Sequence, residues 1–124
     1  MLDGDASGRV LDIYDHKGGN LTVEGFTIRN GCVVNTSGGG LCVQSLSSTA
    51  DAGNITIQHN IITGNRGSGD SFYYYGGGLY ARSAAVHEDA GKSGNIVLIN
   101  NMITGNSILG EDYCGGGVYA STTS

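Results

Sequence analysis

Apolar and polar residues alternate along several short stretches of this chain. In Ile55-Thr56-Ile57-Gln58, for example, every second residue is apolar. A period of two is typical of a β-strand that buries one face and exposes the other. No stretch of convincing length combines helical periodicity with helix caps. The pattern therefore predicts an all-β protein.

The alternating stretches belong to an internal repeat. GNITIQHNIITGN at 53–65 returns 41 residues later as GNIVLINNMITGN at 94–106, and a looser copy, GNLTVEGFTIRNG, occupies 19–31. A glycine-rich word occurs as SGGGLCVQS at 37–45, YYYGGGLYARS at 73–83 and CGGGVYAST at 114–122, with a degenerate form, GRVLDIYD, at 8–15. The chain thus holds about three and a half copies of a unit of 30 to 41 residues.

The apolar pattern within each unit predicts three short strands, LYA, ITIQ and IIT in their best copies, which are separated by turns. Repeated in register, each strand would lie about 4.8 Å from its counterpart in the next copy. Such a coil is a parallel β-solenoid, whose units bury their apolar face only by stacking on neighbours. The residues expected to point inward are Leu41, Val43, Ile55, Ile57, Ile62, Leu79, Ile96, Leu98 and Ile103.

Asparagines mark equivalent corners of successive copies. Asn60 and Asn101 align, so we expect their side-chain amides to hydrogen-bond along the stack. Phe26 takes this place in the first copy, which predicts that an apolar stack replaces the ladder there.

The paired repeat words resemble a known superfamily. Gly39-Gly40-Leu41, Gly77-Gly78-Leu79 and Gly116-Gly117-Val118 are paired with Ile62-Thr63-Gly64-Asn65 and Ile103-Thr104-Gly105-Asn106. These words are similar to those of the pectate-lyase-like superfamily, particularly the glycine-rich repeats of bacterial surface and polymorphic outer-membrane proteins. The resemblance implies an all-β, right-handed parallel β-helix of about three to four short coils. It also implies a single domain over residues 1–124, either shortened or a fragment of a longer protein.

Composition narrows the functional classes. The 124 residues include 23 glycines and carry a net charge of −5, with only six lysines and arginines. That balance argues against nucleic acid as a partner. No apolar run approaches the length of a membrane span. The opening MLDGDASGR lacks the basic and apolar regions of a signal peptide, although members of the superfamily are often extracellular or on the cell surface.

Three cysteines, Cys32, Cys42 and Cys114, have no metal-like spacing, and no cofactor or metal is predicted. We expect Cys42 on an outward strand face and the other two in turns. The cysteines are interpreted as free thiols, with one disulfide and one remaining thiol as the alternative.

The side chains that could bind a ligand lie on the outward face of the glycine-word strands. Alignment gives two rows, the first Asp12, Cys42, Tyr80 and Tyr119, and the second Tyr14, Gln44, Arg82 and Ser121. Aromatic, carboxylate and guanidinium groups on a flat face suit a sugar chain, through stacking and bidentate hydrogen bonds. The candidate carbohydrate-binding residues are therefore Asp12, Tyr14, Tyr80, Arg82 and Tyr119. A solvated strand face without a ligand is the alternative reading of the same rows.

Catalysis has weaker support. Hydrolases of this superfamily need neighbouring aspartates, and its lyases need grouped acidic residues for Ca²⁺ together with a basic residue. Asp12 has no aligned carboxylate in the next copies, and Arg82 lies about two rungs away. We therefore expect a non-catalytic β-helix scaffold or interaction module whose specific role is open, with carbohydrate as its candidate ligand. The alternative is a polysaccharide lyase or glycoside hydrolase, or a remnant of one.

The last copy ends one strand into a new coil, which predicts open strand edges and exposed core residues. Open solenoid ends invite edge pairing unless something covers them. We expect a homodimer joined through the C-terminal coil, with Ile96, Leu98, Val118 and Ala120 at the interface. Two-fold pairing closes after one step, whereas head-to-tail contact would propagate.

Overall fold

The structure is a computed structural model that describes residues 1–69, 74–87, 91–110 and 115–124. These residues form 14 β-strands and no helix. Every pairing between the named strands is parallel. The predicted all-β class is confirmed, and no helix of the described residues is long and apolar enough to cross a membrane.

The strands form four sheets, which we name after the repeat words they contain. The glycine-word sheet has the spatial order β14 (Val118–Thr123), β10 (Leu79–Ala85), β6 (Leu41–Ser47) and β2 (Leu11–Asp15). The ITIQ sheet contains β11 (Ile96–Ile99), β7 (Ile55–Gln58) and β3 (Leu21–Glu24). The IIT sheet contains β1 (Leu2–Asp3), β4 (Thr27–Arg29), β8 (Ile61–Thr63) and β12 (Met102–Thr104). The fourth sheet contains β13 (Ser107–Leu109), β9 (Arg66–Ser68) and β5 (Cys32–Val34).

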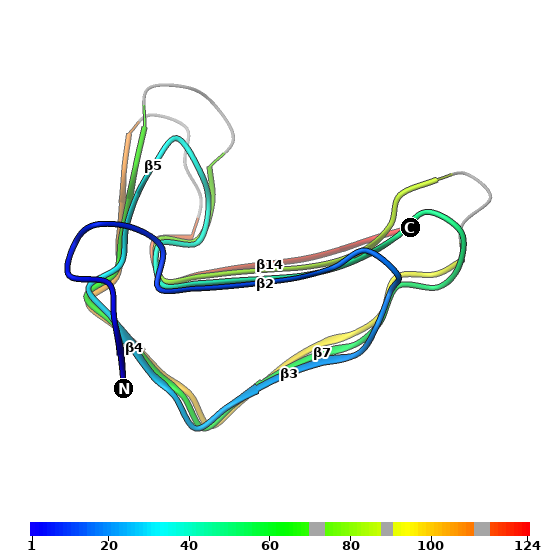
Figure 1. Cartoon of the computed structure of the whole chain (residues 1–124), viewed down its shortest axis with the longest axis horizontal. Coiled ribbons are helices and arrows are strands. Elements are labelled where there is room, and N and C mark those ends of the chain that lie inside the picture. Colours follow the sequence, from blue (N-terminus) through cyan, green and yellow to red (C-terminus); the bar gives the residue numbers. More distant parts are fainter. Residues whose placement is uncertain (70–73, 88–90, 111–114) are drawn as a thin grey trace.

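Successive repeats lie over one another with the register that the sequence alignment predicts. Ile55 pairs with Leu21 on one side and Ile96 on the other, and Ile57 pairs with Val23 and Leu98. The chain passes through the four sheets in the same order in each repeat, so the copies of each strand superimpose in Figure 1. This arrangement is compatible with a parallel β-helix.

The core lies between the glycine-word sheet and the ITIQ and IIT sheets. Six of the residues expected to point inward are fully buried, namely Leu41, Val43, Ile55, Ile57, Ile62 and Leu79. Ile96 and Ile103 are only partly buried against this core. Leu98 has the register of Ile57 but is 40% exposed, because β11 is the outermost strand of its sheet.

Each repeat has a fourth strand that the alternation did not predict. Its three copies have unlike sequences, and only the central residue of each, Val33, Gly67 or Ile108, turns toward its counterparts. A three-residue strand with a glycine at its centre carries too little periodicity to be recognised. The expectation that Cys32 lies in a turn is therefore wrong, since Cys32 begins β5.

The predicted asparagine ladder is confirmed. Asn60 is 1% exposed, and its Nδ2 donates to the Val23 carbonyl at 2.9 Å and to Asn101 Oδ1 at 3.2 Å. The expected apolar stack at Phe26 is wrong. The Phe26 side chain is 39% exposed, while its backbone N–H donates to Asn60 Oδ1 at 2.9 Å and so continues the ladder.

A second ladder follows the IIT strands. Asn65 Nδ2 donates to the Ile28 carbonyl at 3.1 Å and to Asn106 Oδ1 at 2.9 Å. Asn106 Nδ2 donates in turn to the Ile62 carbonyl at 2.8 Å. Each ladder satisfies backbone groups at a corner where the strand ladder is interrupted, which a buried corner requires.

Glycine is required where the chain enters the glycine-word sheet. Gly38, Gly76 and Gly115 have φ of +72°, +65° and +70°, a left-handed conformation that other residues adopt only at a cost. At Gly76 a Cβ would also collide with the Leu79 carbonyl oxygen. The strands that follow are consequently aimed in the same direction in each repeat.

Candidate functional site

The glycine-word sheet assembles the two outward rows in the predicted register. Tyr80 of β10 pairs with Cys42 of β6 on one side and with Tyr119 of β14 on the other. Cys42 pairs in turn with Asp12 of β2. The second row, two residues further along each strand, consists of Tyr14, Gln44, Arg82 and Ser121.

Tyrosine rings stack at one end of the first row. The rings of Tyr80 and Tyr119 are parallel within 3°, with centroids 5.6 Å apart. A third ring, Tyr75, stacks on Tyr119 at 4.2 Å. Tyr75 was not among the predicted site residues, although it belongs to the tyrosine run immediately before the glycine word. Burial raises the pKa of the Tyr80 hydroxyl, while the positive charge of Arg82 acts in the opposite direction.

The other two candidates lie apart from this stack. Asp12 forms an ion pair with Arg9, in which Nη1 and Oδ2 are 2.6 Å apart. Tyr14 is 44% exposed and packs against His16, with ring centroids 4.1 Å apart. Both residues belong to β2, the outermost strand of the sheet. The structure thus brings Tyr80, Tyr119 and Arg82 together but leaves Asp12 and Tyr14 at the far edge.

Arg9 organises the edge of the site near Asp12. Besides the ion pair, its Nε donates to the Gly38 carbonyl at 3.0 Å and its Nη2 to the Ser37 carbonyl at 2.7 Å. Nη2 also donates to Thr36 Oγ1 at 3.0 Å. One guanidinium therefore fixes the turn before β6. No alternation or repeat signals this contact, because Arg9 has no aligned counterpart with the same partners.

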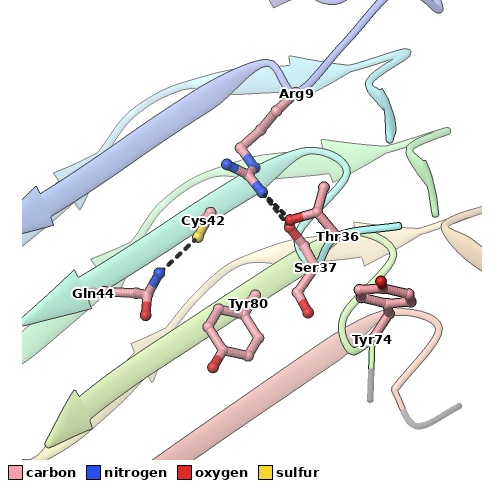
Figure 2. A pocket seen from close by; sticks show the side chains of 7 residues that line it. All are labelled: Arg9, Thr36, Ser37, Cys42, Gln44, Tyr74 and Tyr80. Atoms are coloured by element: carbon pink, nitrogen blue, oxygen red, sulfur yellow. Dashed lines mark hydrogen bonds between the residues drawn. The ribbon is translucent and has the colours of Figure 1, made fainter. Parts of the chain in front are cut away.

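A hollow of about 280 Å³ lies between Arg9 and Tyr80, above Cys42. Figure 2 shows Gln44 at one side of it and Ser37, Thr36 and Tyr74 at the other. Cys42 is only 2% exposed, and Gln44 Nε2 donates to its Sγ at 3.5 Å. Burial raises the pKa of the Cys42 thiol from 9.0 to about 11, so the sulfur stays protonated near neutral pH.

Arg82 borders a different hollow. This space of about 500 Å³ lies at the other end of β10 and includes Val86 and His87 in its lining. Arg82 is two residues from Tyr80 along the strand, so this second hollow lies further along β10 than the first.

The four predicted interface residues lie on outermost strands. Ile96 and Val118 pack partly against the core, whereas Leu98 and Ala120 are exposed. Further exposed apolar side chains lie on β11, β12 and β13, namely Val97, Ile99, Met102 and Leu109.

Neither a metal site nor a disulfide is found in the parts of the chain that the structure describes. No three His, Cys, Asp or Glu side chains gather there in a way that could hold a metal ion. Cys32 and Cys42 are free thiols. Cys114 lies outside the described residues, so the interpretation of that thiol stays a prediction.

Comparisons of the chain with protein-family models, with curated proteins and with solved structures found no match. The class that the structure itself defines is an all-β protein of stacked parallel strands. Its distinctive surface feature is a tyrosine stack beside a polar hollow.

Proposed function

We propose that the chain is a right-handed parallel β-helix of the pectate-lyase-like type and that its glycine-word sheet binds a glycan without cleaving it. The observation that carries this proposal is the stack of Tyr80 and Tyr119 next to the hollow above Cys42. Both features lie on one outward face, on neighbouring strands whose register is fixed by continuous pairing.

Tyrosine suits a sugar because it combines an apolar ring with a polar hydroxyl. The apolar face of a sugar ring packs on the aromatic ring, while hydroxyls at the sugar's edge meet polar side chains. Mutual stacking already holds Tyr119 and Tyr80 in place, so little side-chain entropy is lost on binding. A flat sheet also presents these groups at regular intervals, as a repeating polymer requires.

The chemistry of the two rows supports binding rather than cleavage. Hydrolysis uses two carboxyl groups that flank the scissile bond. The two rows contain one carboxylate, Asp12, and its Oδ2 is engaged by Arg9. The Cys42 thiol is a poor nucleophile, because its pKa is raised to about 11.

Glycan-array screening followed by calorimetry tests the proposal. Tyr80→Ala should weaken binding by on the order of tenfold, which corresponds to about 1.4 kcal/mol. Phe26→Ala is the matched control, because Phe26 is a partly exposed aromatic residue outside the glycine-word sheet. Equal losses in both variants would contradict a site at Tyr80.

The same samples distinguish binding from catalysis. They are incubated with pectate and other acidic glycans, with and without Ca²⁺, and assayed for released products. Product release that disappears in Arg82→Ala would overturn the non-catalytic proposal in favour of the lyase or hydrolase alternative.

We also propose that two copies associate through their C-terminal strands, with Ile96, Leu98, Val118 and Ala120 at the contact. The support is the concentration of exposed apolar side chains on the outermost strands β11, β12 and β13. None of the strands β11 to β14 contains a charged residue.

A further inference from the structure

Cys42 interrupts a row of aromatic rings. Along the first outward row the structure has Tyr119, then Tyr80, and then Cys42 on the next strand. One face of the Tyr80 ring is stacked against Tyr119. Because Cys42 is the neighbour on the opposite side, the second face of the Tyr80 ring is turned toward the Cys42 side of the row. A thiol is much smaller than a phenol ring, so the row of rings ends at Tyr80, while Cys42 itself is covered and only 2% exposed.

The hollow of about 280 Å³ lies beside this end of the row, and Tyr80 and Cys42 are both among the residues that line it. The turn before β6 packs closely on both strands here, because a Cβ at Gly38 would approach Cys42 Cβ at 3.0 Å and Tyr80 Cβ at 3.2 Å. Pockets for drug-sized ligands begin at about 300 Å³. The space therefore suits one ring of a larger ligand rather than a length of polymer.

Polar side chains line much of the hollow, and none of the lining side chains carries an unpaired charge. Arg9 is the cation at its edge, and its guanidinium is already paired with Asp12 and bonded to three further oxygens. An acidic sugar would have to compete with the Asp12 carboxylate for the same guanidinium. Neutral hydrogen-bonding groups line it instead. Thr36 Oγ1 accepts from Arg9 and Ser37 Oγ accepts from the Tyr75 N–H, so each hydroxyl keeps its proton to donate. Gln44 Nε2 donates to Cys42 Sγ, with a second N–H left on the same amide.

We propose that this hollow is a subsite for one neutral pyranose residue, which stacks on the second face of Tyr80 and so continues the row of rings from Tyr119. The Gln44 amide and the hydroxyls of Ser37 and Thr36 contact the sugar hydroxyls. The assignment rests on the proposed function, and it adds that the bound glycan is uncharged at this position.

Filling the hollow tests the assignment. Cys42→Tyr extends the tyrosine row into the hollow, and it should weaken binding of a neutral oligosaccharide identified on the array by on the order of tenfold or more. Cys42→Ser is the matched control, because it keeps the size of the side chain and leaves the hollow open. Binding is measured by calorimetry, and thermal melting reports whether each variant is folded.

Gln44→Ala provides a second test that does not overfill the site. It removes a wall group from a half-buried position and should weaken the same neutral ligand several-fold at an unchanged melting temperature. If Cys42→Tyr fails to fold, this variant and the charge preference of the ligands decide the question.

The outcomes distinguish a failure of the proposed glycan binding from a failure of the subsite assignment. If no glycan binds the wild-type protein, the proposed function itself fails. If glycans bind but only acidic ones do, or if the folded Cys42→Tyr and Gln44→Ala variants bind as tightly as the wild type, the subsite is wrong. In the second case the proposed function stands and the ligand lies elsewhere on the sheet.

Discussion

Cys42 belongs to the outward row of a sheet, yet only 2% of its surface is exposed. Its neighbours in register, Asp12 and Tyr80, have larger side chains. Loss of water around the sulfur disfavours the thiolate, and this desolvation raises the pKa of Cys42 to about 11. Cys42 therefore serves as a small, buried apolar residue rather than as a reactive thiol.

Alkylation of a variant that retains Cys42 as its single cysteine checks this view. Cys32→Ser/Cys114→Ser should react with iodoacetamide far more slowly when native than when unfolded at pH 8. Since the folded pKa is above the ordinary value of 9.0, the protonated thiol stabilises the fold fully below pH 9.0. That contribution is lost as the pH rises through about 11, so stability should fall and labelling accelerate there. Equal native and unfolded rates at pH 8 would contradict the buried thiol.

Asn60 is the best test of the asparagine ladders. Asn60→Ala leaves the Phe26 N–H and the Val23 carbonyl without the bonds that Asn60 makes to them. Unpaired buried groups of this kind cost about 1–3 kcal/mol each, so the free energy of unfolding should fall by about 2–4 kcal/mol. Urea denaturation measures the change. Asn95→Ala, at an exposed position, should stay within about 0.5 kcal/mol of the wild type.

The sequence predicts contacts between residues that occupy equivalent positions in successive repeats. The Asn60 and Asn101 ladder was predictable because the two residues align, and the same reasoning applied to the recurring Thr-Gly-Asn would have found Asn65 and Asn106. The bonds of Arg9 to the turn at 36–38 were not predictable, because they join unlike segments that no alignment relates. The hollow above Cys42 depends on that turn and was missed for the same reason.

At the scale of elements, the sequence predicts the strands whose apolar pattern recurs from copy to copy. The strands LYA, ITIQ and IIT lie in register, as expected from their apolar pattern. The fourth sheet was missed because its inward residue changes from Val33 to Gly67 to Ile108, and a glycine gives no apolar signal. Its strands are held by pairing with their neighbours more than by their own side chains.

Ile57 and Leu98 are similar in size and pair in register, so substituting each of them isolates the effect of burial on stability. Ile57→Ala in β7 should lower the free energy of unfolding by about 2–5 kcal/mol, because a strand lies on either side and the side chain is fully enclosed. In a single chain, Leu98→Ala in β11 should cost less than half as much, because Leu98 is 40% exposed there. Urea denaturation of both variants, at a concentration low enough that two copies do not associate, gives the comparison. Equal costs in the dissociated chain would contradict the exposure of Leu98.

At the scale of the whole molecule, the two ends of the stack differ in chemistry. The outermost strands at the N-terminal end include Asp3, Asp12, Asp15 and Glu24. Those at the C-terminal end, β11 to β14, contain no charged residue. A head-to-tail contact would desolvate the carboxylates of one end against an apolar surface, which is costly. Pairing of two C-terminal ends brings apolar surface against apolar surface and closes after one step.

Light scattering and sedimentation velocity at micromolar concentration test this association. We expect the wild-type chain to be a dimer and Leu98→Lys to be a monomer, because a lysine there would place two like charges in the apolar contact. Val34→Lys is the matched control, since Val34 is an exposed valine on β5, an outermost strand of the opposite end. It should remain a dimer. A monomeric wild type would contradict the association, and loss of the dimer in Val34→Lys alone would place the contact at the N-terminal end instead.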